Sequence, residues 1–167
     1  SLSGDYGYRI IFPIWDDGGV IRGFTGRTLV ETGIPKWKHS FGLGMMYSAR
    51  CLKSELVVLT EGPIDALAVA RYVESDSLAI LGTQLPEEKI EQLSTYKCVV
   101  LWLDPDRAGR KAVVDLAEAL AERFTVHVVM SEGKDPGDLS ESEILKLYNK
   151  RCGWSWSLAL TVLGRSL

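Results

Sequence analysis

The chain has 167 residues and a formal net charge of −3 at pH 7; 46% of its residues are hydrophobic and 25% are charged. This composition is ordinary for a globular protein, and the length suits one domain with a sizeable core and a small additional lobe. No apolar run approaches the roughly 20 residues of a membrane-spanning helix, and the first residues lack a signal-peptide pattern. We therefore expect a cytoplasmic protein without a membrane partner.

The first residue and the spacing of the cysteines support two further expectations. The chain begins with Ser1 rather than Met, which predicts a fragment of a longer protein. Its cysteines are odd in number and far apart, at Cys51, Cys98 and Cys152. They are expected to be reduced, and the absence of a CxxC pair argues against zinc in this chain.

Residues 1–54 are expected to form an N-terminal β-rich lobe. The runs YRIIFPIW and VIRGFTGRTLV flank the turn sequence DDGG, and this pattern predicts an antiparallel hairpin. Phe24 and Trp37 are interleaved with cations that either contact nucleotide phosphates, bases or a template, or lie on a solvated hairpin face. These cations are Arg22, Arg27, Lys36 and Lys38. His39 has no partner at metal-ligand spacing and is expected to be an ordinary surface residue.

Residues 55–139 alternate between strand and helix patterns, which predicts an open, mostly parallel sheet flanked by helices. The expected strands are nearly continuous apolar runs, as burial on both faces requires. They are residues 56–60, 78–81, 98–103 and 125–130. Between them, helical patterns begin near Pro63 and Pro86 and extend over residues 108–123.

Acidic residues follow three of these strands, and residues 56–140 carry a net charge of −7. Because ligands bind at the carboxyl ends of parallel strands, the acids are expected to meet at one edge of the sheet. Clustered carboxylates repel one another unless protons or cations neutralise them, and all-oxygen sites favour Mg²⁺ or Mn²⁺. The acids are Glu61, Asp65, Asp104, Asp106, Asp135 and Asp138. For Asp104 and Asp106 the alternative is that they merely cap the helix that follows.

Glycines next to these acids also carry information. Gly62 follows a strand, where a sharp turn or a close ligand approach needs a small residue, whereas Gly82 is expected to be a plain turn. Gly109 lies in the first turn of a helix, where glycine costs about 1 kcal/mol relative to alanine. Either a close backbone approach or mere tolerance explains it.

Residues 140–167 are expected to form a C-terminal helical segment. SESEILKLYNK predicts a short capped helix. The last stretch predicts a packing helix or a link to a further module, with its apolar face around Trp156, Leu160 and Leu163.

The order of these motifs resembles the Toprim domain, and in particular the DnaG-type and phage DNA primases. Toprim's signature is a Glu after one strand and DxD after a later one, here Glu61 and Asp104/Asp106. EGPIDALAV, LAILGT, LDPDRAGRKA and EGKDPGDL match primase segments in the same order. RIIFPIWDDGGVIRGFTGRTL…PKW matches an upstream segment, in which Arg9, Arg27 and Lys36 lie on the family's basic positions.

The resemblance implies a Toprim-like α/β fold and a primase RNA-polymerase core that condenses NTPs into RNA primers on single-stranded DNA. It implies Mg²⁺ or Mn²⁺ on Asp104 and Asp106, with Asp65 and either Asp135 or Asp138 as further ligands. Glu61 is a ligand or the base for the attacking 3′-hydroxyl. The expected setting is the bacterial cytoplasm or a phage-infected cell, with a replicative helicase as a partner through other regions.

The sequence departs from the family pattern at three places, and two other functions fit the same motifs. Asp17 lies in a turn where many primases carry a basic residue. Gly137 stands where the family has an acid, and Pro105 stands between the aspartates where Gly is common. A metal-dependent Toprim nuclease would use the same acids. A non-catalytic Toprim module that binds nucleic acid or a partner is the third class, although a pure binder does not need the repulsive cluster.

Overall fold

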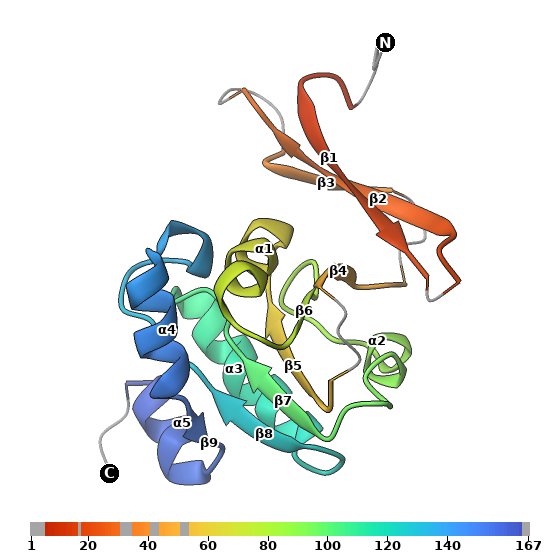
Figure 1. Cartoon of the computed structure of the whole chain (residues 1–167). Coiled ribbons are helices and arrows are strands. Elements are labelled where there is room, and N and C mark those ends of the chain that lie inside the picture. The colour runs from red at the N-terminus through yellow and green to blue at the C-terminus, as the bar shows by residue number, and fades with distance from the viewer. Residues whose placement is uncertain (1–5, 17, 31–34, 41–43, 51–53, 165–167) are drawn as a thin grey trace.

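The computed structural model describes residues 6–16, 18–30, 35–40, 44–50 and 54–164 (Figure 1). Cys51 lies outside the described residues. Within them the chain forms two sheets, one of three strands and one of six, and the larger is flanked by helices. The predicted α/β class with a small N-terminal β-rich lobe is therefore confirmed.

The larger sheet has the strand order β4-β6-β5-β7-β8-β9. Its four central strands pair in parallel, as predicted, and the two edge strands are antiparallel. β6 begins two residues before the predicted 78–81, because the polar Asp76 and Ser77 are buried in the sheet. The short edge strands were not predicted. The strands are β4 (Tyr47–Arg50), β5 (Leu56–Thr60), β6 (Asp76–Ala79), β7 (Cys98–Leu101), β8 (Thr125–Val128) and β9 (Cys152–Gly153).

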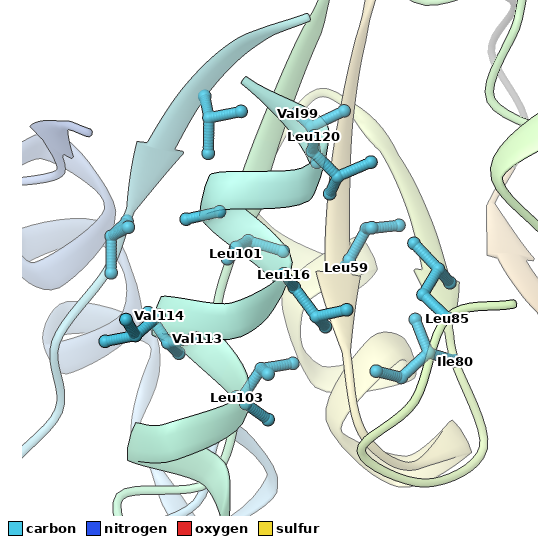
Figure 2. Close-up of a cluster of buried hydrophobic side chains, with 14 of the residues drawn as sticks. Leu59, Ile80, Leu85, Val99, Leu101, Leu103, Val113, Val114, Leu116 and Leu120 are labelled. Carbon is cyan, nitrogen blue, oxygen red and sulfur yellow. The ribbon is translucent and has the colours of Figure 1, made fainter. Parts of the chain in front are cut away.

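Helices cover both faces of this sheet. On one face α3 and α5 pack on alternate residues of the strands, and Figure 2 shows Val113, Leu116 and Leu120 of α3 directed at this layer. On the other face α1 and α4 enclose a second cluster around the fully buried Trp102. The helices are α1 (Pro63–Tyr72), α2 (Glu87–Glu91), α3 (Arg107–Leu120), η1 (Pro136–Asp138), α4 (Glu141–Asn149) and α5 (Trp156–Val162).

Local sequence signals explain where the C-terminal helices begin and how they pack. Ser140 and Glu143 form a capping box at the start of α4, which confirms the predicted capped helix. The predicted apolar face of the last helix is wrong, because Trp156 is 66% exposed while Ala159 and Val162 are buried. Small side chains let α5 lie close to α3, so they face the core in place of Trp156.

The three-stranded sheet contains the predicted hairpin and one further strand. β1 (Arg9–Trp15) and β2 (Ile21–Thr28) pair antiparallel, and β3 (Trp37–His39) adds to β2. Phe12 of β1 joins the two sheets, since its ring centroid lies 5.7 Å from that of Trp37 and 5.7 Å from that of Tyr47 in β4. Figure 1 shows this small sheet beside the end of the larger one where α1 begins.

Candidate metal centre

The centre of the site is a pair of carboxyls at the ends of two neighbouring parallel strands. Glu61 follows β5 and Asp104 follows β7, and these strands pair directly. The Asp104 backbone N–H donates to Glu61 Oε1 at 3.3 Å. Asp104 Oδ1 is buried and has no hydrogen-bond partner in the described part of the chain. The predicted meeting of these two acids at one sheet edge is thus present.

Burial and neighbouring acids disfavour the charged forms of both carboxyls. Burial, followed by the Asp104 charge, raises the pKa of Glu61 to about 7. Burial, followed by the charges of Asp65, Asp135 and Asp106, raises the pKa of Asp104 to about 7, and the Lys36 charge opposes this shift. A cation in this position would replace the missing positive charge.

Asp65 brings the third acidic segment to the same place. It lies in the first turn of α1, and its Oδ1 accepts a hydrogen bond from the Gly137 N–H at 2.9 Å. Burial raises the pKa of Asp65, and the Asp135 charge acts in the same direction. A Cβ at position 137 would lie 3.0 Å from Asp65 Oδ1, so glycine suits this contact better than the acid of the family pattern.

Asp106, Asp135 and Asp138 surround this centre. Asp106 caps α3 by accepting from the Gly109 N–H at 2.7 Å, as the capping alternative predicted, and it is exposed. Its charge nevertheless helps to raise the pKa of Glu61 and of Asp104. Asp135 and Asp138 line the cavity described below.

Gly109 is required by a close backbone approach. A Cβ at this position would lie 2.2 Å from the Asp104 carbonyl oxygen and 2.7 Å from Glu61 Oε1. Real side chains never approach so closely, so the start of α3 can lie against the two acids only with glycine here. Gly62 is also tight, since its Cβ would lie 2.9 Å from Asp65 Oδ2.

A cavity of about 290 Å³ separates the acidic edge from the small sheet. On the small-sheet side it is lined by Arg27, Lys36, Trp37 and His39. His39 is exposed, as predicted for a surface residue, and it also lines the cavity; pairing of β3 with β2 places it there, and its spacing in the sequence gave no signal of this. The other wall is lined by Glu61, Gly62, Pro63, Ile64, Asp65, Leu81, Gly82, Asp104, Asp135, Gly137 and Asp138.

The remaining predicted cations do not line this cavity. Arg9 is only 7% exposed and donates to the carbonyls of Gly26, Lys36 and Pro35, so it ties the small sheet together. Arg22 pairs with Asp16 at 2.7 Å. Lys38 lies over the ring of Tyr6, at 4.8 Å from its centroid.

The donor set at the acidic edge fits a hard divalent cation. All candidate ligands are carboxylates, one buried oxygen lacks a partner among the described residues, and burial with neighbouring acids raises the pKa of Glu61 and of Asp104 to about 7. Among the described residues, no three acidic, histidine or cysteine side chains converge as a ready-made ligand set. Glu61 and Asp104 are therefore the part of the site that the fold itself preorganises.

Comparisons with known proteins give a consistent result. The Toprim-like family matches residues 58–140. The chain is 31% identical over 157 residues to the DNA primase of Campylobacter jejuni, covering 85% of this chain and 26% of that protein. It is 36% identical over 149 residues to the DNA primase of Thermotoga maritima, covering 81% and 26%. The chain thus spans about a quarter of the length of these curated relatives.

The fold agrees with a solved structure of the same kind. The structure of the DnaG primase catalytic domain bound to ssDNA matches 94% of this chain and 56% of that chain. The TM-score is 0.77 and the sequence identity is 25%. Within the described residues, no helix is long and apolar enough to cross a membrane.

Proposed function

The chain carries a Toprim-like domain and is a homologue of bacterial DNA primases, and from this we propose that it condenses ribonucleoside triphosphates into RNA primers on single-stranded DNA. In this proposal residues 1–54 are the N-terminal lobe of the core, residues 55–139 its Toprim domain and residues 140–167 a C-terminal helical segment, and the lobe and the segment each add an edge strand, β4 and β9, to the larger sheet. The protein acts in the cytoplasm, and a replicative helicase is its partner through regions outside this chain.

One observation carries the proposal: the cavity has an acidic wall and a cationic wall. Glu61, Asp65 and Asp104 face Arg27 and Lys36 across it. A nucleoside triphosphate together with a divalent cation matches both walls, because carboxylates bind the cation and guanidinium or ammonium groups bind phosphate oxygens. Trp37 adds an aromatic surface on the same side as the cations.

The residues divide the work of a phosphoryl transfer. In the reaction the 3′-hydroxyl of the growing RNA attacks the α-phosphorus of the incoming triphosphate, its proton leaves, and pyrophosphate departs. Asp104, with Asp65, Asp106 and either Asp135 or Asp138, would hold Mg²⁺ or Mn²⁺, and Glu61 would be a further ligand or the base. The metal, when bound, stabilises negative charge on the phosphates. Arg27 and Lys36 orient the triphosphate, and Glu61, if not itself a ligand, accepts the hydroxyl proton.

The direct test is primer synthesis. The native protein, Asp104→Ala and Asp115→Ala are each incubated with NTPs, Mg²⁺ and a single-stranded DNA template, and RNA products are separated by length. Asp115 is the control because it is exposed on α3 and pairs with Lys111. We expect products from the native and control proteins and none from Asp104→Ala. Undiminished synthesis by Asp104→Ala would remove the assignment.

The same assay separates the two alternative functions. A Toprim nuclease would shorten the DNA without added NTPs, and a binding module would leave both strands unchanged. Neither alternative is favoured, because the relatives are primases and because a docking surface gains nothing from two half-buried carboxyls whose charged forms are disfavoured.

A further inference from the structure

Lys89 of α2 is a buried cation that the proposed reaction does not use. Its side chain is only 7% exposed, and its Nζ donates to the Ile80 carbonyl at 2.6 Å. Burial lowers the pKa of Lys89. Burying an ammonium is unfavourable unless it satisfies a group that needs it, and Ile80 is itself fully buried. The hydrogen bond to the Ile80 carbonyl is therefore a specific contact.

The residues after Ile80 form a strained turn. Leu81 has a φ of 61°, a left-handed conformation that a leucine rarely adopts, and Gly82 has a φ of 132°. Such a turn persists only where surrounding contacts hold it. The bond from Lys89 holds the carbonyl directly before it.

This turn fixes the backbone of the central acid. The Ile80 N–H donates to the Thr60 carbonyl at 2.9 Å, and the Leu81 N–H donates to the Glu61 carbonyl at 2.9 Å. Leu81 and Gly82 also line the same cavity as Glu61. The contacts thus run from Lys89 through the turn to Glu61.

We propose that Lys89 is a positioning residue that holds the Leu81–Gly82 turn, and through it Glu61, in the geometry that binds the divalent cation. This rests on the proposed metal site at Glu61 and Asp104. Without Lys89 the Ile80 carbonyl is buried and unpaired, the strained turn relaxes, and the hydrogen bond to the Glu61 carbonyl weakens. Groups that orient metal ligands in this indirect way typically change metal affinity by about 10–100-fold.

A purely electrostatic role for Lys89 predicts the opposite sign. Removing a cation near an acidic site strengthens cation binding, because repulsion of the metal falls. Positioning predicts that Lys89→Met weakens Mn²⁺ binding, whereas Lys89→Arg, which keeps a donor and the charge, recovers it at least in part. The direction of the change in affinity therefore decides between the two roles.

The experiment compares the native protein with Lys89→Met, Lys89→Arg and Ser77→Ala. Ser77 is the matched control. It is buried in β6, and its Oγ donates to the Ala66 carbonyl at 2.9 Å, so Ser77→Ala also removes one buried hydrogen bond from a side chain to a backbone carbonyl. Mn²⁺ affinity is measured by titration calorimetry well below the melting temperature, and amide exchange of Leu81 by NMR. We expect Lys89→Met to bind Mn²⁺ about tenfold more weakly and to exchange Leu81 faster. Ser77→Ala is expected to change neither.

Native or tighter Mn²⁺ binding by Lys89→Met, or an equal loss in Ser77→Ala, would overturn the proposal. If Lys89→Met does not fold, Lys89→Gln replaces it, since it removes the charge and shortens the reach to Ile80. Native Mn²⁺ affinity and native Leu81 exchange in Lys89→Gln would also overturn the proposal. If the native protein binds no Mn²⁺, the proposed metal site is wrong, whatever the role of Lys89. Leu81 exchange in the variants then still decides whether Lys89 holds the turn.

Discussion

At the scale of single residues, the proposed metal ligands Glu61 and Asp104 are carboxyls whose charged forms the fold disfavours. Both carboxyls are partly buried and each has a pKa of about 7; burial is the main cause for both, and the charges of neighbouring acids add to it. Near neutral pH both carboxyls therefore exchange protons with solvent. Binding of a metal ion to these carboxyls near neutral pH would release protons.

The raised pKa values predict how stability depends on pH. The ordinary values are 4.5 for Glu61 and 3.8 for Asp104, so the folded state binds more protons than the unfolded state from there up to about pH 7. The stabilisation is fully present below the ordinary values and is lost as the pH rises through about 7. The melting temperature of the metal-free protein should therefore fall between about pH 5 and pH 8.

The control for this pH dependence is the double variant Glu61→Gln/Asp104→Asn, which has neutral side chains of similar shape. Its melting temperature should fall less over the same pH range, and thermal unfolding followed by circular dichroism measures both proteins. Parallel curves for the two proteins would show that these carboxyls do not have the raised pKa values assigned to them.

Gly109 gives a second test at this scale. In an open helix position Gly→Ala stabilises by about 1 kcal/mol, but a Cβ here would lie 2.2 Å from the Asp104 carbonyl oxygen. We expect Gly109→Ala to destabilise the protein by more than about 1 kcal/mol and to weaken Mn²⁺ binding, measured by urea unfolding and calorimetry. Gly153→Ala is the control, since its Cβ would meet only His127, at 3.8 Å. Unchanged stability in Gly109→Ala would contradict the close approach.

At the scale of secondary-structure elements, strands β2 and β3 present the cations to the cavity. Arg27 of β2 lies 5.6 Å from the ring centroid of Trp37 in β3, and Lys36 directly precedes β3. Loss of one charge-assisted contact to a phosphate weakens binding by roughly 1.5–3 kcal/mol. We expect Lys36→Ala and Arg27→Ala each to raise the KM for NTPs about tenfold or more in primer synthesis.

Arg22→Ala is the matched control on the same sheet, because Arg22 pairs with Asp16 and does not line the cavity. Its KM should stay close to the native value. A similar rise in all three variants would mean that the small sheet acts through its overall charge and not through the two cavity residues.

Elements buried on both faces were predictable from the sequence, and short or exposed elements were not. The central strands β5 and β7 consist of apolar runs, and the acids directly after them had to meet at one edge. β4 and β9 have no such signature, since pairing with a neighbouring strand alone defines them. The positions of His39 and Lys89 also left no pattern in the sequence. His39 lines the cavity because β3 pairs with β2, and the partner of Lys89 is a backbone carbonyl.

At the scale of the whole molecule, two oppositely charged segments of the sequence form the two walls of the cavity. Residues 1–55 carry a net +2 and residues 56–140 a net −7. The fold places cations of the first segment across the cavity from acids of the second. Contacts of Phe12 with Trp37 and Tyr47 hold the small sheet against the larger one, so the spacing between the walls is set by packing.

The central claim is that Glu61 and Asp104 form a divalent-cation site, and Mn²⁺ titration calorimetry at about pH 8 tests it most directly. At that pH both carboxyls are mostly ionised, so their protons compete only weakly with the metal. The account predicts binding by the native protein and by the exposed control Asp115→Ala, and none by Asp104→Ala. Equal binding by all three proteins, or none by the native protein, would contradict it.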